Sequence, residues 1–461
     1  MNKDSTFAYQ VVYRYLIELI DSSATDGELK LPSLRQLAER LNVSVSTTKY
    51  AYALLEDEGR VYSRPKRGYF RSETPVLRPI ATGNLLDNVY ACARQPGMLA
   101  LCSDAPSMLL SMENPLLMTE RELLRQYPRS AVPLYQPLGE IELRTVLAER
   151  YTCSADNYWR PEQVYIGADL RSVLQISLAA LKLHGCVALV ESPCSWAILR
   201  QLQVANIQVI EMPLRADGRV DMPMVHGLLQ GKNVALAVLS STVSIPHGSL
   251  MPAADKRQLC TWLSERGAWL FENDSYGEFC FAQERSRYRD FADPDRLLVF
   301  ATFDKVIGSE APFGYVLVRG HEAAMQHQLL DRAFRLSPIR QKALARLYGS
   351  RRIDQHTHLL RGLLGERMKQ MTDLLQTHAA DQLNAVVPAG GATLWVQSVR
   401  AVDMRQVYQR LLADNIVIAP GELFSQQGLW RDCLRLSYTV DWSKDIPKAV
   451  KALAQAIDQT Y

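Results

Sequence analysis

Three residues whose types suit amine chemistry follow apolar segments in the second half of the chain. Asp274 and Tyr276 come directly after Trp269–Phe271, and Lys305 follows Leu297–Ala301, 31 residues after Asp274. α/β sheets place ligands at the carboxyl ends of their strands. There, a carboxylate, a phenol and a lysine suit pyridoxal phosphate. The carboxylate would hold the ring nitrogen protonated, the phenol would donate a hydrogen bond to the ring oxygen, and the lysine would form an imine. A single lysine is far more often a solvated surface group, so this spacing alone favours the interpretation of Lys305 as an ordinary surface residue.

The elements that must position these residues alternate along the chain. Helical patterns lie at about 169–183 and near 195–204, between short apolar segments that we expect to be strands, at Val164–Ile166, Val187–Val190, Val234–Leu239, Trp269–Phe271 and Leu297–Ala301. This alternation predicts an α/β fold with a mostly parallel sheet. From about 340 to 461, helices mix with shorter strands such as Leu394–Gln397 and Ile416–Ala419, which predicts a smaller α+β C-terminal lobe.

A separate unit is predicted at the N-terminus. An amphipathic helix is expected at about 6–22, and a short helix should begin at a capping box formed by Ser33 and Gln36. Ser44 or Ser46 can cap a third helix that runs to about Asp57. The segments Val61-Tyr62-Ser63 and Gly68-Tyr69-Phe70 then alternate like the two strands of a hairpin.

The tip of that hairpin is basic. Between residues 60 and 71 there are five basic residues and no acidic one: Arg60, Arg64, Lys66, Arg67 and Arg71. Three helices and a basic-tipped hairpin describe a winged helix-turn-helix, whose third helix enters the major groove while the wing contacts phosphates. The alternative is a small helical cap domain whose charges are simply solvated.

The same stretch resembles the GntR-type DNA-binding domain. Residues 31–38, 43–48 and 51–59 follow its motifs L-P-S-x-R-x-L-A, V-S-R-x-T-V and A-Y-x-x-L-E-x-x-G, except that Val45 stands where the family usually has arginine. The resemblance implies operator binding. The candidate DNA contacts are Arg35, Ser46, Thr47 and Lys49 near the third helix and Arg64, Lys66 and Arg67 in the wing.

From about residue 95 to 461 the chain resembles a fold-type I aminotransferase, in the arrangement of the MocR (GabR-like) branch of GntR regulators. The matching segments are Tyr135–Gly139, Gly167–Asp169, Glu191–Pro193, Pro246–Gly248, Glu272–Tyr276, Thr302–Lys305, Ala419–Phe424 and Leu434–Ser437. The resemblance implies that Tyr135 reaches the cofactor phosphate of the partner subunit and that Arg435 clamps a ligand carboxylate. It also implies cofactor contacts from Gly167, Ala168, Thr302 and Trp196.

The departures from the family pattern lie mainly where the cofactor phosphate would bind. Pro312 replaces the family arginine that grips the phosphate, and Asp169 stands where a neutral donor is usual. Asp304 replaces a small hydroxyl residue beside the lysine. Ser195 stands where the ring-stacking aromatic is expected, with Trp196 one position later. The anchors for the phosphate are therefore eroded, whereas those for the ring nitrogen, the ring oxygen and the imine remain.

The composition is that of a folded protein of two or three domains. The 461 residues carry 52 basic and 49 acidic side chains. No apolar run approaches the roughly 18 to 20 residues of a membrane helix, and Met1–Gln10 is too polar for a secretory signal. The eight cysteines are scattered, with no C-x-x-C pair, which argues against disulfides and a structural zinc site. We expect a cytoplasmic protein without bound metal.

The predicted organisation is a winged helix-turn-helix at 1–72, a linker at 73–100 and an aminotransferase-like domain at 101–461 that binds the effector and dimerises. The leading hypothesis is a transcriptional regulator that senses pyridoxal phosphate, an amine or an amino acid, with an internal aldimine at Lys305 and an effector carboxylate on Arg435. Two alternatives stay open: a functional aminotransferase with an attached DNA-binding domain, and a cofactor-free dimerisation scaffold.

Overall fold

The computed structural model describes residues 8–22, 29–57, 60–65, 67–72, 84–126, 136–154, 157–212, 214, 219–283, 285–332 and 336–460. The contacts between residues divide the chain into two compact units. The first unit contains residues 1–100 and 415–417, and the second contains residues 101–414 and 418–461.

The first unit contains the predicted winged helix-turn-helix. Its elements are α1 (Ala8–Ser22), α2 (Leu34–Arg40), α3 (Val45–Asp57), β1 (Val61–Arg64) and β2 (Gly68–Arg71). The predicted capping box begins α2: the Gln36 amide donates to Ser33 Oγ at 3.3 Å, and the Ser33 amide donates to Gln36 Oε1 at 3.1 Å. Ser44 is the residue that caps α3, because its Oγ accepts the amide of Thr47 at 3.0 Å.

The hairpin is tied to the helices from both sides. The strands β1 and β2 pair antiparallel, and the Leu31 amide donates to the carbonyl of Tyr69, so the segment before α2 extends the hairpin. Glu56 on α3 accepts both the amide and the hydroxyl of Ser63 on β1, at 3.0 and 2.7 Å. The helices and the hairpin therefore form one packed unit around a small core that includes Leu16, Ala51 and Leu55.

The second half of the predicted linker has regular structure. Asn84 caps helix α4 (Leu85–Ala93), and strand β3 (Leu99–Ala100) pairs parallel with β13 (Ile416–Val417). Residues 73–83 lie outside the described part of the chain. The domain boundaries at 72 and 100 stay a prediction.

A seven-stranded sheet is the frame of the second unit, with the strand order β4-β10-β9-β8-β7-β5-β6. Its strands are β4 (Val164–Gly167), β5 (Val187–Val190), β6 (Gln208–Glu211), β7 (Val234–Ser240), β8 (Trp269–Asn273), β9 (Leu297–Thr302) and β10 (Gly314–Val318). Neighbouring strands from β9 to β6 are parallel, whereas β10 runs antiparallel to both β4 and β9. The sheet is therefore mixed, and β6 and β10 are the strands that the sequence pattern did not predict.

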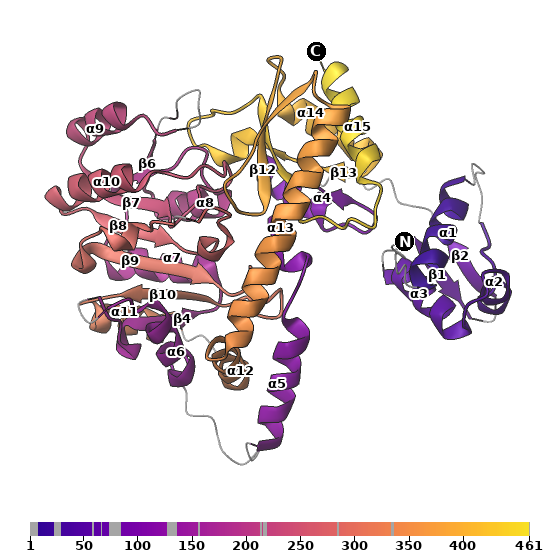
Figure 1. Cartoon of the computed structure of the whole chain (residues 1–461), viewed down its shortest axis with the longest axis horizontal. Coiled ribbons are helices and arrows are strands. Elements are labelled where there is room, and N and C mark those ends of the chain that lie inside the picture. The colour runs from indigo at the N-terminus through magenta and orange to yellow at the C-terminus, as the bar shows by residue number, and fades with distance from the viewer. Residues whose placement is uncertain are drawn as a thin grey trace. The chain divides into compact units, whose positions relative to one another are not determined.

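Helices cover both faces of this sheet (Figure 1). Side chains alternate between the faces along each strand, so Leu270 joins one buried apolar cluster and Phe271 joins the other. The helices of the large lobe are α5 (Glu113–Gln126), α6 (Ile141–Tyr151), α7 (Leu170–Ala180), α8 (Trp196–Val204), α9 (Met222–Gly231), α10 (Ala253–Glu265), α11 (Glu322–Arg332) and α12 (Pro338–Tyr348). Burial on both faces explains why the strands are almost continuously apolar.

The predicted C-terminal lobe is an antiparallel sheet with helices. Its elements are β11 (Leu383–Val386), β12 (Thr393–Ser398), α14 (Met404–Leu411), β14 (Ala419–Pro420), β15 (Cys433–Ser437) and α15 (Ile446–Asp458). The long helix α13 (Arg351–His378) runs from α12 to α15 and so connects the two lobes (Figure 1). The single strand predicted at 416–419 is divided between β13 and β14, which belong to different sheets.

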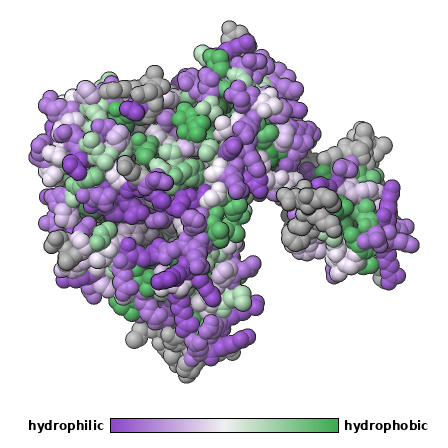
Figure 2. All heavy atoms as spheres, in the orientation of Figure 1, coloured by the Kyte–Doolittle hydropathy of each residue, from purple (hydrophilic) through white to green (hydrophobic). Residues whose placement is uncertain are grey.

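The surface is dominated by hydrophilic residues. On the face shown in Figure 2, hydrophobic residues are scattered or lie in small groups among charged and polar ones. Within the described ranges, no helix combines the length and the apolar character needed to cross a membrane.

Tyr52 gives a test of the packing of the winged unit. Its hydroxyl donates to the Pro32 carbonyl at 2.6 Å, and its ring is fully buried against that of Tyr69. Tyr52→Phe should lower the free energy of local opening of α3 by about 1 kcal/mol, which is about fivefold faster hydrogen exchange of its amides in the full chain. Tyr50→Phe is the control because Tyr50 is largely exposed. Equal exchange in the two variants would contradict this packing.

Candidate functional site

Four residues that are distant in sequence meet in the second unit. Lys305 Nζ donates to the carbonyl oxygen of Asp104 and to its Oδ1, both at 3.1 Å. Arg435 donates from one terminal nitrogen to Asp104 Oδ2 at 3.1 Å, and the Tyr276 hydroxyl donates to the Asp104 carbonyl. We call Asp104, Tyr276, Lys305 and Arg435 the amine chamber. The predicted lysine, tyrosine and arginine are therefore brought together, around an aspartate that the sequence did not single out.

Arg435 is the most deeply buried member of the chamber. It lies on β15 with a side-chain exposure of 1%, and its second terminal nitrogen donates to the Cys102 carbonyl. Its guanidinium lies over the rings of Trp196 and Phe424, at 4.3 and 5.0 Å from the ring centroids. Trp196, predicted as a cofactor contact, thus positions Arg435 through a cation–π contact.

The charges of the chamber compensate one another. Burial alone would raise the pKa of Asp104, but Lys305 and Arg435 outweigh it and lower that pKa to about 2. Burial alone would lower the pKa of Lys305, but Asp104, with Tyr276 and Asp304, raises it well above its ordinary value. At neutral pH the chamber therefore holds a carboxylate between two cations, and the Lys305 amine is protonated.

Asp274 belongs to a different network. Its Oδ2 accepts from the Tyr151 hydroxyl at 2.7 Å and pairs with Arg289 at 2.8 Å, and its Oδ1 accepts from Ser241. Arg289 also pairs with Glu272 at 2.8 Å. Among the described residues, no hydrogen bond or ion pair joins Asp274 to the amine chamber. Its predicted role beside a ring nitrogen stays a prediction.

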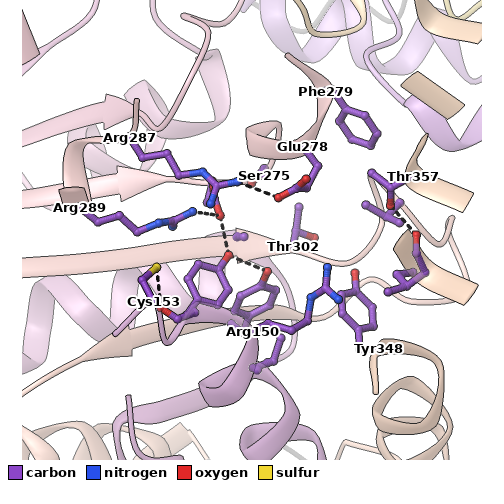
Figure 3. Close-up of a pocket in the computed structure, with 17 residues that line it drawn as sticks. Arg150, Cys153, Ser275, Glu278, Phe279, Arg287, Arg289, Thr302, Tyr348 and Thr357 are labelled. Atoms are coloured by element: carbon purple, nitrogen blue, oxygen red, sulfur yellow. Dashed lines mark hydrogen bonds and ion pairs between the residues drawn. The ribbon is translucent and has the colours of Figure 1, made fainter. Parts of the chain in front are cut away.

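The Asp274 network borders a polar cavity of about 90 Å³ (Figure 3). Arg287 and Arg289 enter it from one side, and Arg150 and Tyr348 line another side. Gly277 is required here because a Cβ atom at this position would lie 1.9 Å from Asp274 Oδ1. Burial alone would raise the pKa of Asp274, but Arg289 and Arg287 hold it below its ordinary value, so Asp274 is ionised at neutral pH.

The predicted phosphate turn is intact in shape but already contains a carboxylate. Gly167 ends β4, and Asp169 caps α7, with Oδ1 accepting the amide and hydroxyl of Ser172 at 2.7 and 2.6 Å. Ala168 is half-buried between them, and Thr302 donates to Asp304 at 2.7 Å. Pro312 is exposed and has no donor. The predicted partner-reaching residue Tyr135 lies outside the described part of the chain.

The candidate DNA-contacting residues lie on two surfaces of the first unit. Ser46 and Lys49 are exposed on α3, opposite the buried Thr48 and Tyr52. The side chain of Thr47 is half-buried and shares a hydrogen bond with Ser44. Arg35 is exposed on α2.

In the wing, Arg67 is exposed at the turn between β1 and β2. The Arg64 guanidinium lies over the rings of Tyr62 and Phe70, at 5.3 Å from each centroid. Lys66 lies outside the described residues. The third helix and the wing thus present basic and polar groups, as predicted.

Asp104 is the residue that sequence reasoning missed. It lies 201 positions before Lys305 and 331 before Arg435, in an irregular segment between β3 and α5. No spacing or motif in the sequence links these positions. The sequence also gives no indication that Arg289, 15 positions after Asp274, forms a buried ion pair with it, because arginines are usually exposed.

Replacing Asp274 tests the structural role of its network. Asp274→Asn leaves Arg289 with one carboxylate in a buried site, which should destabilise the protein by about 3 kcal/mol and lower its melting temperature. Asp295→Asn, at an exposed carboxylate, is the control and should stay within about 0.5 kcal/mol. A melting temperature of Asp274→Asn equal to that of the control would show that the ion pair with Arg289 is dispensable.

Comparison with known protein families divides the chain in the same way as the sequence motifs. Residues 108–453 match the family described as aminotransferase class I and II, and residues 8–70 match the bacterial regulatory proteins of the gntR family. The first match contains three of the four chamber residues, Tyr276, Lys305 and Arg435, and the second covers the winged helix-turn-helix from α1 to Phe70 on β2.

Related proteins share this combination. The chain is 26% identical to the HTH-type transcriptional regulator YdcR of Escherichia coli, over 98% of this chain and 99% of that protein. It is 25% identical to PdxR of Corynebacterium glutamicum, an HTH-type pyridoxine biosynthesis transcriptional regulator, over 77% and 76% of the two chains.

Among solved structures, kynurenine aminotransferase of Pyrococcus horikoshii superposes with a TM-score of 0.71 at 20% identity. The superposition covers 82% of this chain and 94% of that one. It establishes the aminotransferase fold. The chain therefore belongs to the class I and II aminotransferase family and carries a GntR-type winged helix-turn-helix, which is the arrangement of the MocR-like transcriptional regulators.

Proposed function

We propose that this regulator binds operator DNA through α3 and the wing and senses a small molecule in the amine chamber. The observation that carries the proposal is the convergence of Lys305, Tyr276 and Arg435 in a chain whose first unit is a winged helix-turn-helix. Sensing requires only that a ligand prefers one placement of the DNA-binding units, because this preference shifts operator occupancy.

The proposed DNA interface uses its residues in two ways. Ser46, Thr47 and Lys49 on α3 would contact base edges in the major groove, while Arg64 and Arg67 in the wing would contact phosphates. Arg35 on α2 is a further polar contact. A homodimer would present two such units to two half-sites of a two-fold symmetric operator.

The chamber fits the reactive end of pyridoxal phosphate. Lys305 offers a primary amine, Tyr276 a phenol for the ring oxygen, and Arg435 a guanidinium for a ligand carboxylate. Fewer donors are offered to the phosphate end of the cofactor, because Asp169 already accepts from the first turn of α7 and Pro312 offers no donor. We therefore propose weak binding, with Lys305, Tyr276, Thr302 and the turn at Gly167 and Ala168 holding the cofactor.

When bound, pyridoxal phosphate supplies an aldehyde for primary amines and an electron-withdrawing ring. Lys305 must lose a proton before its amine can act as a nucleophile, and the adjacent Asp104 opposes this loss by raising its pKa. Tyr276 keeps its proton, because burial and Asp104 raise its pKa. Arg435 orients a ligand through two terminal nitrogens, which suits the planar shape of a carboxylate.

A working aminotransferase is the second candidate function, supported by the retained Lys305 and Arg435. The occupied phosphate turn and the protonated lysine count against rapid turnover. A cofactor-free dimerisation scaffold is the third candidate. Multiple turnovers of an amino acid with a keto acid would establish the enzyme, and a protein that takes up no added cofactor would establish the scaffold.

Cofactor binding gives the first test of the proposed function. Full-length protein titrated with pyridoxal phosphate should gain an absorbance band near the visible edge, and borohydride should fix the cofactor on Lys305, as located by peptide mass spectrometry. Lys305→Ala should lose both signals. Lys342→Ala is the control, because Lys342 pairs with Glu142 at 2.5 Å and with Glu140 at 3.3 Å, which are not chamber residues. Labelling that is spread over several lysines would contradict a specific site.

DNA binding gives a second test. Arg67→Ala should weaken binding to every sequence alike and lower the slope of log affinity against log salt by about 1, as expected for a phosphate contact. Lys49→Ala should instead change the discrimination between sequences, because bases are read in the major groove. An unchanged salt slope for Arg67→Ala would remove the wing from the interface.

A further inference from the structure

Residues 102–104 of the chain itself accept the hydrogen bonds of Lys305, Tyr276 and Arg435. Asp104 presents one carboxylate oxygen to Lys305 and the other to Arg435, both at 3.1 Å. Its carbonyl accepts from Lys305 and Tyr276, and the carbonyl of Cys102 accepts from Arg435. Each donor of the chamber that the proposed function assigns to a ligand therefore has a partner in residues 102–104.

The Asp104 carboxylate has the chemistry of the ligand group expected there. An α-amino acid carries a carboxylate and an amine on one carbon atom, which match an arginine and a site of amine chemistry side by side. Asp104 offers Arg435 the same planar carboxylate that such a ligand would offer. The two carboxylates must therefore compete for one guanidinium.

The burial of Arg435 decides which ligands can win this competition. Removing one partner of a buried ion pair is strongly destabilising because it leaves a charge uncompensated. Arg435 has 1% of its side chain exposed, whereas Asp104 has 31% exposed. Asp104 can thus turn to water, but only if another anion takes its place on Arg435.

We infer that Asp104 is an internal competitor that a ligand carboxylate must displace, so that the effector is a primary amine that also carries a carboxylate. The inference rests on the proposed sensing function and specifies its ligand. A simple amine leaves Asp104 on Arg435. A carboxylate ligand releases residues 102–104 and removes the Asp104 carboxylate from Lys305.

The displaced segment, residues 102–104, lies close to the end of the first unit along the chain. Ala100 is the last residue of the continuous part of the first unit, and Asp104 follows four positions later. The Leu101 carbonyl accepts the amide of Ser437, two residues after Arg435 on β15. Release of Asp104 would therefore act next to one of the places where the chain passes from one unit to the other.

Calorimetry on full-length, cofactor-free protein tests the competition, with propionate and ethylammonium as probes. Each probe is alanine without one of its two charged groups. Asp104→Asn should bind propionate at least about tenfold more tightly than the wild type does, with no gain for ethylammonium. Asp304→Asn removes a carboxylate that is 3.8 Å from Lys305 and should gain less than about threefold for propionate. Equal propionate affinity in Asp104→Asn and the wild type, or an equal gain for both probes, would overturn the inference.

If Asp104→Asn folds poorly, the effect of propionate on its melting temperature provides the test. Propionate should then raise the melting temperature of the variant and not that of the wild type, because it replaces the missing anion. Absence of this rescue would count against the inference.

Displacement in the wild type can be followed at Cys102, a buried cysteine that is not part of a disulfide. Saturating alanine should increase its alkylation rate at least about fivefold, ethylamine should not, and buried Cys260 is the internal control. An unchanged rate at Cys102 would overturn the release of the segment. None of these measurements uses DNA or pyridoxal phosphate, so a failure here with intact DNA and cofactor binding refutes only the inference.

Discussion

The bridge that Asp104 makes between Lys305 and Arg435 is the interaction on which the proposed function of the second unit depends. It neutralises two cations that the fold otherwise buries close together. It also ties an irregular segment near the N-terminus of the unit to β15 and to the turn after β9. The same contacts set the protonation of Lys305 and the availability of Arg435, so structure and ligand chemistry are controlled by one carboxylate.

The architecture of the second unit places this bridge between its two lobes. The mixed sheet and the helices on its two faces hold Tyr276 and Lys305 beyond the ends of β8 and β9, and the C-terminal sheet holds Arg435. The separate network of Asp274, Arg289 and Glu272 fixes the chain after β8 by buried ion pairs. A buried charge network of this kind favours one arrangement of the turn that carries Tyr276.

Local patterns in the sequence predicted most elements because each pattern has a local physical cause. The capping box at Ser33, the apolar strands of the large sheet and the hairpin at 61–71 were predicted and are present. The strands β6 and β10 were not predicted, because short apolar segments cannot be told from parts of buried helices by their pattern alone. Asp104 and Arg289 were missed because their partners are set by tertiary folding, and α4 because Pro and Gly residues around it suggested a linker.

The central claim is that occupancy of the chamber changes DNA binding. The most direct measurement is the affinity of the full-length protein for a DNA sequence selected from a random pool, with and without saturating pyridoxal phosphate and alanine together. Coupling between two sites is typically about 5-fold to 150-fold in affinity. We predict a change in this range for the wild type and none for Lys305→Ala. Identical affinities of the wild type with and without the two ligands would contradict the account.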